Sequence, residues 1–161
     1  MLHQAKKKSN VELNEQYIIK VIRKSKLDTI DLESIRNEVD IMKEINHKNI
    51  IKLITSFENF EYIYLVTEYF DNCTSLVEYI KKFNYVLEEH KISKLIKQIF
   101  EVIEFMHKKH ILCRNIKTEN VLVNESLDIK MSNFRLLRIL GSNQLVQQEP
   151  YGAMVSCILF Y

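Results

Sequence analysis

The chain has 161 residues, of which 47% are hydrophobic and 27% are charged, and its formal net charge is +2. This composition is typical of one soluble globular domain and excludes a mostly disordered chain. The weak net charge gives no indication of a nucleic-acid-binding surface, and no apolar run reaches the ~18 residues of a membrane-spanning helix.

The first half of the chain predicts strands around one amphipathic helix. Residues 1–16 are polar and are expected to form an irregular lead-in. Residues 16–23 (QYIIKVIR) are β-branched and aromatic, which predicts a buried strand. Residues 28–45 predict a helix, because apolar side chains recur there at steps of three and four. Two more strands are expected over residues 50–57 and 61–67.

The second half predicts two helices followed by a small hairpin. Residues 75–83 predict a short helix, and residues 88–109 carry the strongest helical pattern of the chain. Six apolar residues form a stripe on this second helix and are expected to pack in the core: Ile92, Leu95, Ile96, Ile99, Ile103 and Met106. Residues 121–123 and 128–131 predict the hairpin. Together these elements predict an α+β fold.

The three cysteines indicate a reducing compartment. Cys73, Cys113 and Cys157 lie far apart and form no C-x-x-C pair, which argues against a zinc site or a disulfide framework. The first ten residues lack the apolar core of a signal peptide. We therefore expect a cytoplasmic protein, with the nucleus not excluded.

Two segments on either side of the predicted hairpin resemble those of a known family. CRNIKTEN, residues 113–120, resembles the catalytic loop H-R-D-L-K-P-E-N of eukaryotic protein kinases. Eighteen residues after Asn115, Asn133 opens NFR where that family has its D-F-G metal loop. Other matches precede them in the family's order: YIIK at 17–20 for V-A-I-K, Glu38 for the helix glutamate, HKNIIKL at 47–53, and LVTEY at 65–69 for the hinge. The chain is thereby identified as a member of the kinase family over about residues 17–140, closest to the calcium/calmodulin-dependent Ser/Thr type.

The resemblance implies a two-lobe kinase fold. The small lobe and hinge would occupy residues 17–70, and a partial large lobe would occupy residues 71–161. The small lobe is expected to lack the family's first two strands, and the large lobe to be truncated after the activation segment. Residues 150–161 (PYGAMVSCILFY) either correspond to the start of the central large-lobe helix or form an arbitrary apolar tail.

The resemblance also implies a nucleotide site. Lys20 would hold the α- and β-phosphates of ATP, and Glu38 would hold Lys20 by an ion pair. Glu68 in the hinge and Leu122 in the large lobe would complete the site. Against this, Ile18 replaces a small alanine beside the adenine ring, and the chain contains no glycine-rich phosphate loop.

Four further positions carry the catalytic and metal roles. Lys117 and Asn120 retain the family's phosphate-contacting and second-metal residues, whereas Asn115 and Asn133 replace the two aspartates. An amide can orient a substrate hydroxyl but cannot take its proton, and losing a general base typically costs ~10²–10⁴ in rate. Magnesium prefers anionic oxygens, and an amide offers only a dipole. ATP and Mg²⁺ are therefore implied by the family but weakened by these residues.

Three interpretations stay open. The leading one is a pseudokinase that acts as a binding or regulatory module. The second is an active ATP-dependent Ser/Thr kinase that uses Lys20, Glu38, Lys117 and Asn120, and the third is an incomplete product of a longer gene. The apolar residues 150–161 favour a protein partner or self-association, and no nucleic-acid or membrane partner is expected.

Overall fold

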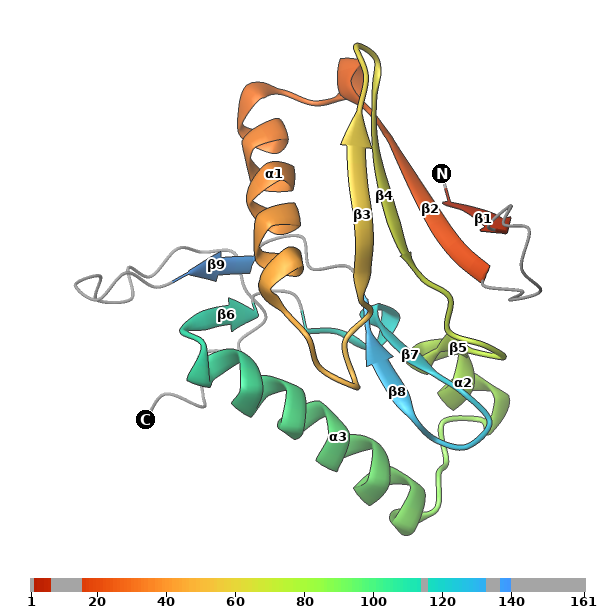
Figure 1. Cartoon of the computed structure of the whole chain (residues 1–161). Coiled ribbons are helices and arrows are strands. Elements are labelled where there is room, and N and C mark those ends of the chain that lie inside the picture. The colour runs from red at the N-terminus through yellow and green to blue at the C-terminus, as the bar shows by residue number, and fades with distance from the viewer. Residues whose placement is uncertain (1, 7–15, 114–115, 133–136, 140–161) are drawn as a thin grey trace, which may run out of the picture. The chain divides into compact units, whose positions relative to one another are not determined.

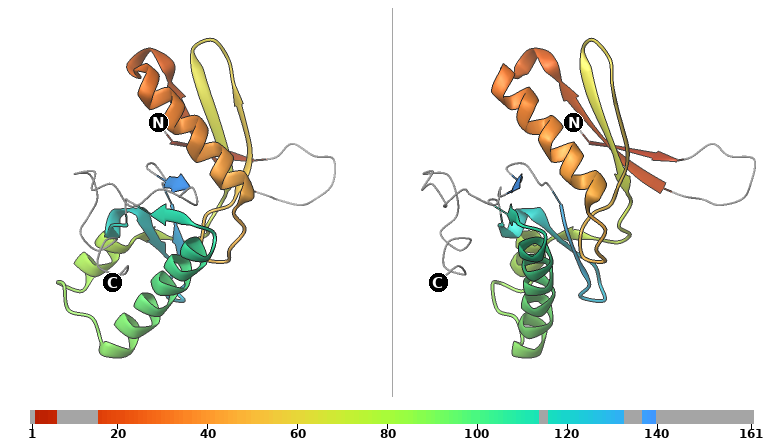
Figure 2. Two further views of the ribbon diagram at one scale, coloured as in Figure 1. Left: turned by 90° about the vertical axis from the view of Figure 1, so that its left-hand side faces the viewer. Right: turned by 60° about the vertical axis from the view of Figure 1, so that its left-hand side comes forward.

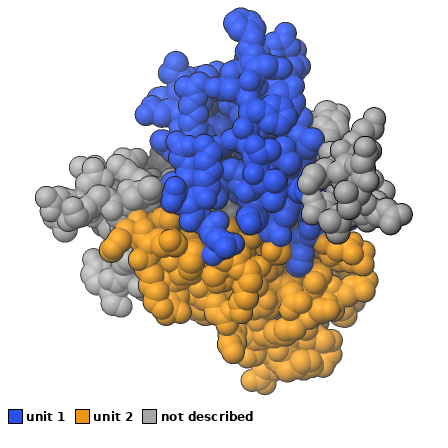
Figure 3. Space-filling model, viewed as in Figure 1, with its two compact units in different colours: residues 1–46, 51–70 blue, residues 47–50, 71–161 orange. Residues whose placement is uncertain are grey.

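The computed structural model describes residues 2–6, 16–113, 116–132 and 137–139. The chain divides into two compact units, coloured separately in Figure 3. One unit comprises residues 1–46 and 51–70, and the other comprises residues 47–50 and 71–161. Residues 47–50 thus belong to the second unit, although they lie between two stretches of the first.

A four-stranded antiparallel sheet organises the first unit (Figure 1). Its strands are β1 (Leu2–Lys6), β2 (Gln16–Arg23), β3 (Leu53–Glu58) and β4 (Tyr62–Glu68), in the order β1-β2-β4-β3. The bounds of β2 agree with the prediction, since its β-branched and aromatic residues favour a pleated, half-buried surface. A short 3₁₀ turn, η1 (Lys24–Lys26), follows β2.

Strand β1 corrects the expectation for the start of the chain. Residues 1–16 were expected to be irregular. In the structure Leu2–Lys6 pairs antiparallel with β2, with Leu2 opposite Lys20 and Lys6 opposite Gln16. An unpaired edge of β2 leaves backbone N–H and C=O groups available for pairing, and pairing through the backbone needs no apolar side chains.

Helix α1 (Thr29–Glu44) lies beside the sheet in Figures 1 and 2 and packs on β3. It begins where predicted, because the Asp28 carboxylate caps its first turn by accepting a hydrogen bond from the Asp31 N–H at 2.7 Å. One face of the helix is buried and supplies the core of this unit: Ile35, Glu38, Val39, Ile41 and Met42.

The second unit contains two helices and short strands. Helix α2 (Leu76–Lys82) begins after Ser75, whose hydroxyl accepts a hydrogen bond from the Glu78 N–H at 3.3 Å. Helix α3 (Glu89–Lys108) leads into the remaining elements: β6 (Ile111–Cys113), η2 (Thr118–Asn120), β7 (Val121–Val123), β8 (Ile129–Met131) and β9 (Leu137–Ile139). Strand β5 (Thr74–Ser75), β7 and β8 form one sheet, and β6 pairs with β9.

The apolar stripe of α3 is buried only in part. Leu95, Ile103 and Met106 are buried as predicted, and α3 packs on β6 and β8. Ile92 and Ile96 were also expected in the core, yet they are 40% and 45% exposed. The periodicity identified the apolar side of the helix, but the short strands β6 and β8 cover only part of its width. No helix in the described part of the chain is long and apolar enough to span a bilayer.

Candidate functional site

The predicted site residues are distributed over both units. Lys20, Glu38 and Glu68 belong to the first unit, and Lys117, Asn120 and Leu122 belong to the second. Asn115 and Asn133, the two aspartate positions, lie outside the described residues. Each unit therefore carries its own part of the predicted site.

Lys20 lies on the face of the sheet that meets α1. It is opposite Leu65 in the register of β2 and β4, and opposite residues share a face. The same face carries Ile63, two residues away on β4, and Glu58, which is opposite Ile63 on β3. Glu58 forms an ion pair with Arg36 of α1, Nη2 to Oε1 3.5 Å, which identifies this face as the inner one.

Glu38 occupies the layer between α1 and the sheet. It is 3% exposed and lies on the same helix face as the buried Ile35 and Met42. A carboxylate in such a place is costly unless it is paired or hydrogen-bonded. The fold thus directs Lys20 and Glu38 toward one layer of the first unit, but no ion pair joins the two residues in the described part of the chain, so that pair stays a prediction.

Glu68 ties the end of β4 to the start of β3. Its Oε1 accepts a hydrogen bond from the Lys52 N–H at 2.8 Å, and its own N–H donates to the Lys52 carbonyl at 3.0 Å. Both groups serve the local backbone, so this residue has a structural role whether or not a nucleotide binds. The nucleotide contact of Glu68 stays a prediction.

Asn120 and Ser132 bring together the two segments that carry the metal positions. The Asn120 carbonyl accepts hydrogen bonds from the Ser132 N–H at 2.8 Å and the Ser132 hydroxyl at 3.1 Å. Asn120 is 5% exposed, and its N–H donates to the Lys117 carbonyl at 2.9 Å. Lys117 itself is exposed and has extended backbone angles at the start of η2. Leu122 follows on β7 and is half-buried.

Gln98 of α3 holds β8, the strand that leads to this site, through all the hydrogen-bonding positions of its amide. Its oxygen accepts from the Asn49 side chain at 2.9 Å and the Ile129 N–H at 3.1 Å. Its nitrogen donates to the carbonyls of Leu127 at 2.8 Å and Lys94 at 3.1 Å. The sequence analysis missed this residue, because one glutamine on an amphipathic helix reads as an exposed polar position.

The segment of residues 47–50 forms the other half of this support. The Asn49 side chain donates to the Ile129 carbonyl at 2.8 Å, and the Asn49 carbonyl accepts from the Met131 N–H at 2.8 Å. Ile50 also forms a parallel bridge with Met131. We call Asn49, Gln98 and the two β8 residues Ile129 and Met131 the amide clamp.

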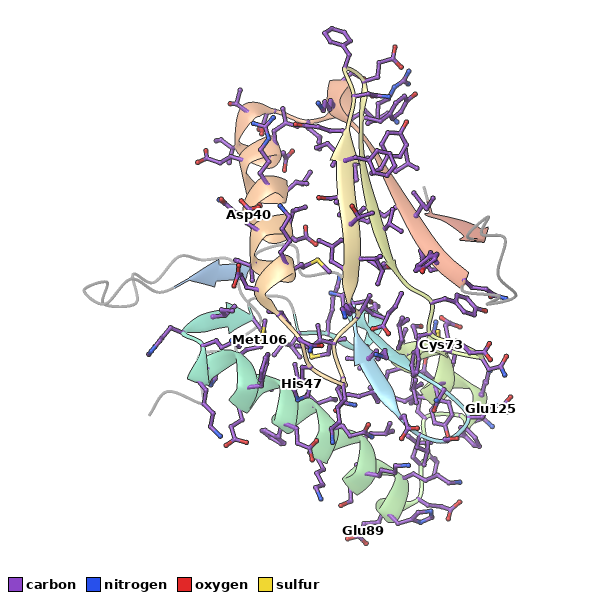
Figure 4. All side chains as sticks on the ribbon, viewed as in Figure 1. Asp40, His47, Cys73, Glu89, Met106 and Glu125 are labelled. Carbon is purple, nitrogen blue, oxygen red and sulfur yellow. The ribbon has the colours of Figure 1, made fainter. Side chains whose placement is uncertain are left out.

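Two contacts with α3 fix the start of this segment. The His47 ring lies beside the helix (Figure 4), with its centroid 4.8 Å from that of Phe105. Its Nδ1 accepts a hydrogen bond from the Asn49 N–H at 3.1 Å, which requires an unprotonated Nδ1. Burial, and next the charge of Lys48, lower the pKa of His47 below 6.5. Lys48 forms an ion pair with Glu101 at 2.9 Å.

Cys113, at the position of the family's histidine, is a buried thiol. Its side chain is buried on β6, and burial raises the pKa of the thiol to about 12. A thiol that stays protonated is a poor nucleophile and a poor metal ligand. This residue therefore acts as a small apolar core side chain.

Comparison with known families decides what these elements belong to. A family profile described as protein kinase domain matches residues 4–154. The chain belongs to the protein kinase family. The match extends the resemblance of residues 17–140 in both directions, and at its start it reaches into β1 of this kinase fold.

The chain is similar to several Ser/Thr kinases. It is 40% identical to serine/threonine-protein kinase SIK1 of Rattus norvegicus over 119 residues, 74% of this chain and 15% of that protein. It is 39% identical to SIK2 of Gallus gallus over 125 residues, with the same coverage of 74% and 15%. Myosin light chain kinase A of Dictyostelium discoideum is 33% identical over 146 residues, 89% of this chain and 48% of that protein. The chain thus spans less than half the length of these relatives.

The donor set of this kinase does not fit magnesium. All three family metal and base positions, Asn115, Asn120 and Asn133, carry neutral amides. Within the described residues, no group of three or more His, Cys, Asp or Glu side chains could hold a metal ion. Mg²⁺ is bound mainly through one or two carboxylates together with substrate phosphates, so these residues do not replace the ligands that the family supplies.

Proposed function

We propose that this chain is a pseudokinase, a kinase-shaped module that binds a protein partner and transfers phosphate poorly or not at all. The observation that carries the proposal is the pair of neutral amides, Asn115 and Asn133, at the two positions where the family has carboxylates. Phosphoryl transfer depends on positioning and on charge neutralisation at the phosphates. An uncharged pair supplies neither a proton acceptor nor an anionic metal ligand.

The surrounding structure supports a module that is retained while its chemistry is lost. Asn120 is tied to Ser132, and the amide clamp holds β8, although neither contact requires a carboxylate. Lys20 faces the layer that contains Glu38, so the cationic half of a nucleotide site persists. We infer that nucleotide binding, where it occurs, does not depend on magnesium.

A nucleotide titration tests this directly. We expect ATP affinity to be the same with and without Mg²⁺, because no anionic ligand joins the ion to the protein. Lys20→Ala should weaken any binding that is seen, since it removes the cation that would face the phosphates. A clear tightening by Mg²⁺ in the wild-type chain, absent in the Lys20→Ala variant, would contradict the proposal.

Restoring the carboxylates tests the chemical argument. The double variant Asn115→Asp, Asn133→Asp should transfer phosphate to a generic Ser/Thr substrate ~10²–10⁴ faster than wild type, the range of one general base. The matched control is the same double variant with Lys20→Ala, which should fall back to the wild-type level. A flat result in the double variant would remove the chemical basis of the proposal.

The second candidate is an active ATP-dependent Ser/Thr kinase. It is favoured by the names of the relatives and by the retention of Lys20, Glu38, Lys117 and Asn120. Phosphorylation by the wild-type chain that Lys20→Ala abolishes would establish this activity and overturn the pseudokinase. A third candidate, an incomplete product of a longer gene, predicts a broad and non-cooperative melt.

We place the module in the cytoplasm. Its cysteines lie far apart and form no C-x-x-C pair, which fits a reducing compartment, and the partners that we propose are proteins. Self-association through the apolar residues 150–161 is the alternative to a different protein partner as a way to bury that segment. The mass of the purified chain in solution separates the two possibilities. Self-association gives a mass that rises with protein concentration, whereas a chain that binds a different protein stays monomeric when it is alone.

A further inference from the structure

Strand β4 divides its side chains between the two faces of the first unit's sheet. Ile63 and Leu65 are 5% and 2% exposed on the inner face, the side on which α1 lies in Figure 2. Tyr62 and Tyr64 alternate with them along the strand and therefore point to the opposite, outer face. Both tyrosines are only half-buried, so the outer face is open where the inner face is closed.

Aromatic rings from two strands form a continuous layer on this outer face. Phe57 of β3 is opposite Tyr64, and the two rings are stacked with centroids 4.8 Å apart and an interplanar angle of 16°. The Tyr62 ring follows, with its centroid 6.2 Å from that of Tyr64. Arg23 of β2 is opposite Tyr62 and places its guanidinium carbon 5.9 Å from the centre of that ring. We call Arg23, Phe57, Tyr62 and Tyr64 the aromatic platform.

The aromatic platform is accessible and carries hydrogen-bond donors. Phe57 is 53% exposed. The Tyr64 hydroxyl accepts a hydrogen bond from the Asn59 side chain at 3.5 Å, which leaves its own proton to be donated. Within the described part of the chain, no carboxylate pairs with the Arg23 guanidinium, which lies over the Tyr62 ring.

The acid next to the platform is directed away from it. Glu58 follows Phe57 on β3 and points to the inner face, where its carboxylate lies 2.8 Å from Lys24 Nζ and 3.5 Å from Arg36 Nη2. The outer face thus offers aromatic rings, hydroxyl donors and a positive charge. A ligand that fits it supplies apolar rings, hydrogen-bond acceptors and a negative charge.

We propose that the aromatic platform binds an extended, proline-rich segment of a protein partner, and that this segment carries a carboxylate. Proline has no backbone N–H, so such a segment presents its carbonyls as acceptors to the tyrosine hydroxyls. A polyproline II helix has no internal hydrogen bonds, which leaves these carbonyls available. Its rings pack on aromatic side chains, as they do in the aromatic-lined grooves of peptide-binding domains. The carboxylate pairs with Arg23 in a charge-assisted hydrogen bond.

The dimensions of the outer face suit a short segment. Ile19 and Val66 are opposite each other and continue this face beyond Tyr64 as a half-buried aliphatic surface. From Tyr62 to Val66, β4 covers about 14 Å at 3.4 Å per residue. Five residues of polyproline II span about 12 Å at 3.1 Å per residue. A segment with prolines three positions apart and an acid at the Arg23 end therefore covers the platform.

A different protein suits this face better than a second copy of the chain. The 161 residues contain one proline, Pro150, so no segment of this sequence is proline-rich. Two copies that met face to face would use the same patch on both sides, which must then be self-complementary. Two platforms offer each other donors and positive charge but no carboxylate, so they are not. The proposal rests on the proposed function in one respect, namely that the chain binds a protein partner.

A titration with synthetic peptides tests the proposal, with fluorescence anisotropy as the measurement. The probe is a labelled decapeptide of nine prolines and one central aspartate, and wild type should bind it saturably below about 1 mM. A glycine–serine peptide of the same length with the same aspartate should not saturate, because it has no rings and no preformed helix. A proline peptide with lysine in place of the aspartate should bind about tenfold more weakly, since it meets Arg23 with a like charge.

Three variants separate the ring, the charge and the hydroxyls. Phe57→Ser removes the most exposed ring of the platform and should weaken binding of the aspartate peptide about tenfold. Arg23→Glu reverses the charge and should make the lysine peptide the tighter ligand of the two. Tyr62→Phe combined with Tyr64→Phe keeps the rings and removes the donors, and should weaken binding about fivefold. This double variant replaces Phe57→Ser if that variant does not fold.

Phe60→Ser and Lys26→Glu are the matched controls. Phe60 is 96% exposed, but it lies in the turn between β3 and β4 rather than on the outer face. Lys26 is an exposed cation of η1. Each control variant should keep the affinity for the aspartate peptide within about twofold of wild type.

Three results would overturn the proposal. Absence of saturable binding of the aspartate peptide, or equal binding of the glycine–serine peptide, shows that the face does not recognise polyproline II. Equal losses in Phe57→Ser and Phe60→Ser show that the peptide binds elsewhere. A wild-type mass that rises with protein concentration, and that Phe57→Ser returns to the monomer, assigns the face to a second copy. None of these measurements involves nucleotide or phosphate transfer, so their failure is distinct from failure of the pseudokinase proposal.

Discussion

The two units treat their buried polar groups in different ways. The first unit buries a carboxylate, Glu38, beside the sheet face that carries Lys20. The second unit buries Asn49, whose side-chain nitrogen donates to the Ile129 carbonyl of β8, and Asn120, whose backbone carbonyl accepts hydrogen bonds from Ser132. Charge survives where the family holds a nucleotide, and neutral hydrogen bonding survives where it holds a metal. The difference teaches that one fold can hold a charged group in one buried polar layer and neutral hydrogen-bonding groups in another.

The largest expected effect tests the charged layer of the first unit. Glu38→Ala should lower the free energy of unfolding by about 3 kcal/mol, because the ion pair that we propose between Glu38 and Lys20 would lose one buried member and leave the other uncompensated. Chemical denaturation measures this value. A double-mutant cycle with Lys20→Met should show coupling of about 1 kcal/mol or more between the two residues.

Asp40→Ala on the same helix is the control for Glu38. Asp40 lies on the exposed side of α1 (Figure 4) and pairs only with Lys43, at 3.0 Å. Its loss should cost less than about 0.5 kcal/mol, as is usual for exposed ion pairs. If Glu38→Ala cost no more stability than Asp40→Ala, the buried Glu38 carboxylate would contribute no more than an exposed one.

The next effect tests the amide clamp of the second unit. Gln98→Ala should destabilise the chain by about 2 kcal/mol, because it leaves buried partners, among them the Asn49 side chain, without their hydrogen bonds. Lys97→Ala, at the neighbouring exposed position, should change stability by less than about 0.5 kcal/mol. Hydrogen exchange of the Ile129 amide should accelerate in the first variant and not in the second. Equal losses of stability in the two variants would show that the hydrogen bonds of the amide clamp do not stabilise the chain.

A smaller effect tests the contact between Asn120 and Ser132. Ser132→Ala removes the hydroxyl bond of 3.1 Å but keeps the backbone bond of 2.8 Å, so we expect a loss of about 1 kcal/mol. Ser126→Ala, in the exposed turn between β7 and β8, should be close to neutral. Thermal unfolding of both variants gives the comparison. A neutral Ser132→Ala would show that the hydroxyl bond adds nothing to the backbone bond between the two residues.

The smallest effect is a pH dependence that belongs to the second unit. Burial lowers the pKa of His47 in the folded state below 6.5, so the unfolded chain binds more protons there. The contribution of His47 is therefore complete above pH 6.5 and is lost as the pH falls below that value. His47→Gln should flatten this part of the stability profile, whereas His90→Gln, at an exposed position, should not. Identical profiles of stability against pH for the two variants would show that the pH dependence comes from groups other than His47.

Local patterns predicted most of the elements because their causes are local. The strand of QYIIKVIR, the capping of α1 by Asp28 and the long helix α3 each follow from neighbouring residues. The prediction failed at β1, where pairing depends on the open edge of a distant strand rather than on apolar content. It failed again at Ile92 and Ile96, because periodicity identifies an apolar helix face but not what lies against it.

The sequence by itself determined the family and the loss of two carboxylates, since both depend on residue identity at fixed spacing along the chain. Only the tertiary structure decided that Lys20 faces α1, that Gln98 holds β8 and that Ile92 and Ile96 of α3 are exposed. The physical reason is that these features arise between residues far apart in the chain. Sheet register, the satisfaction of buried amides and the coverage of a helix face exist only once the segments have met.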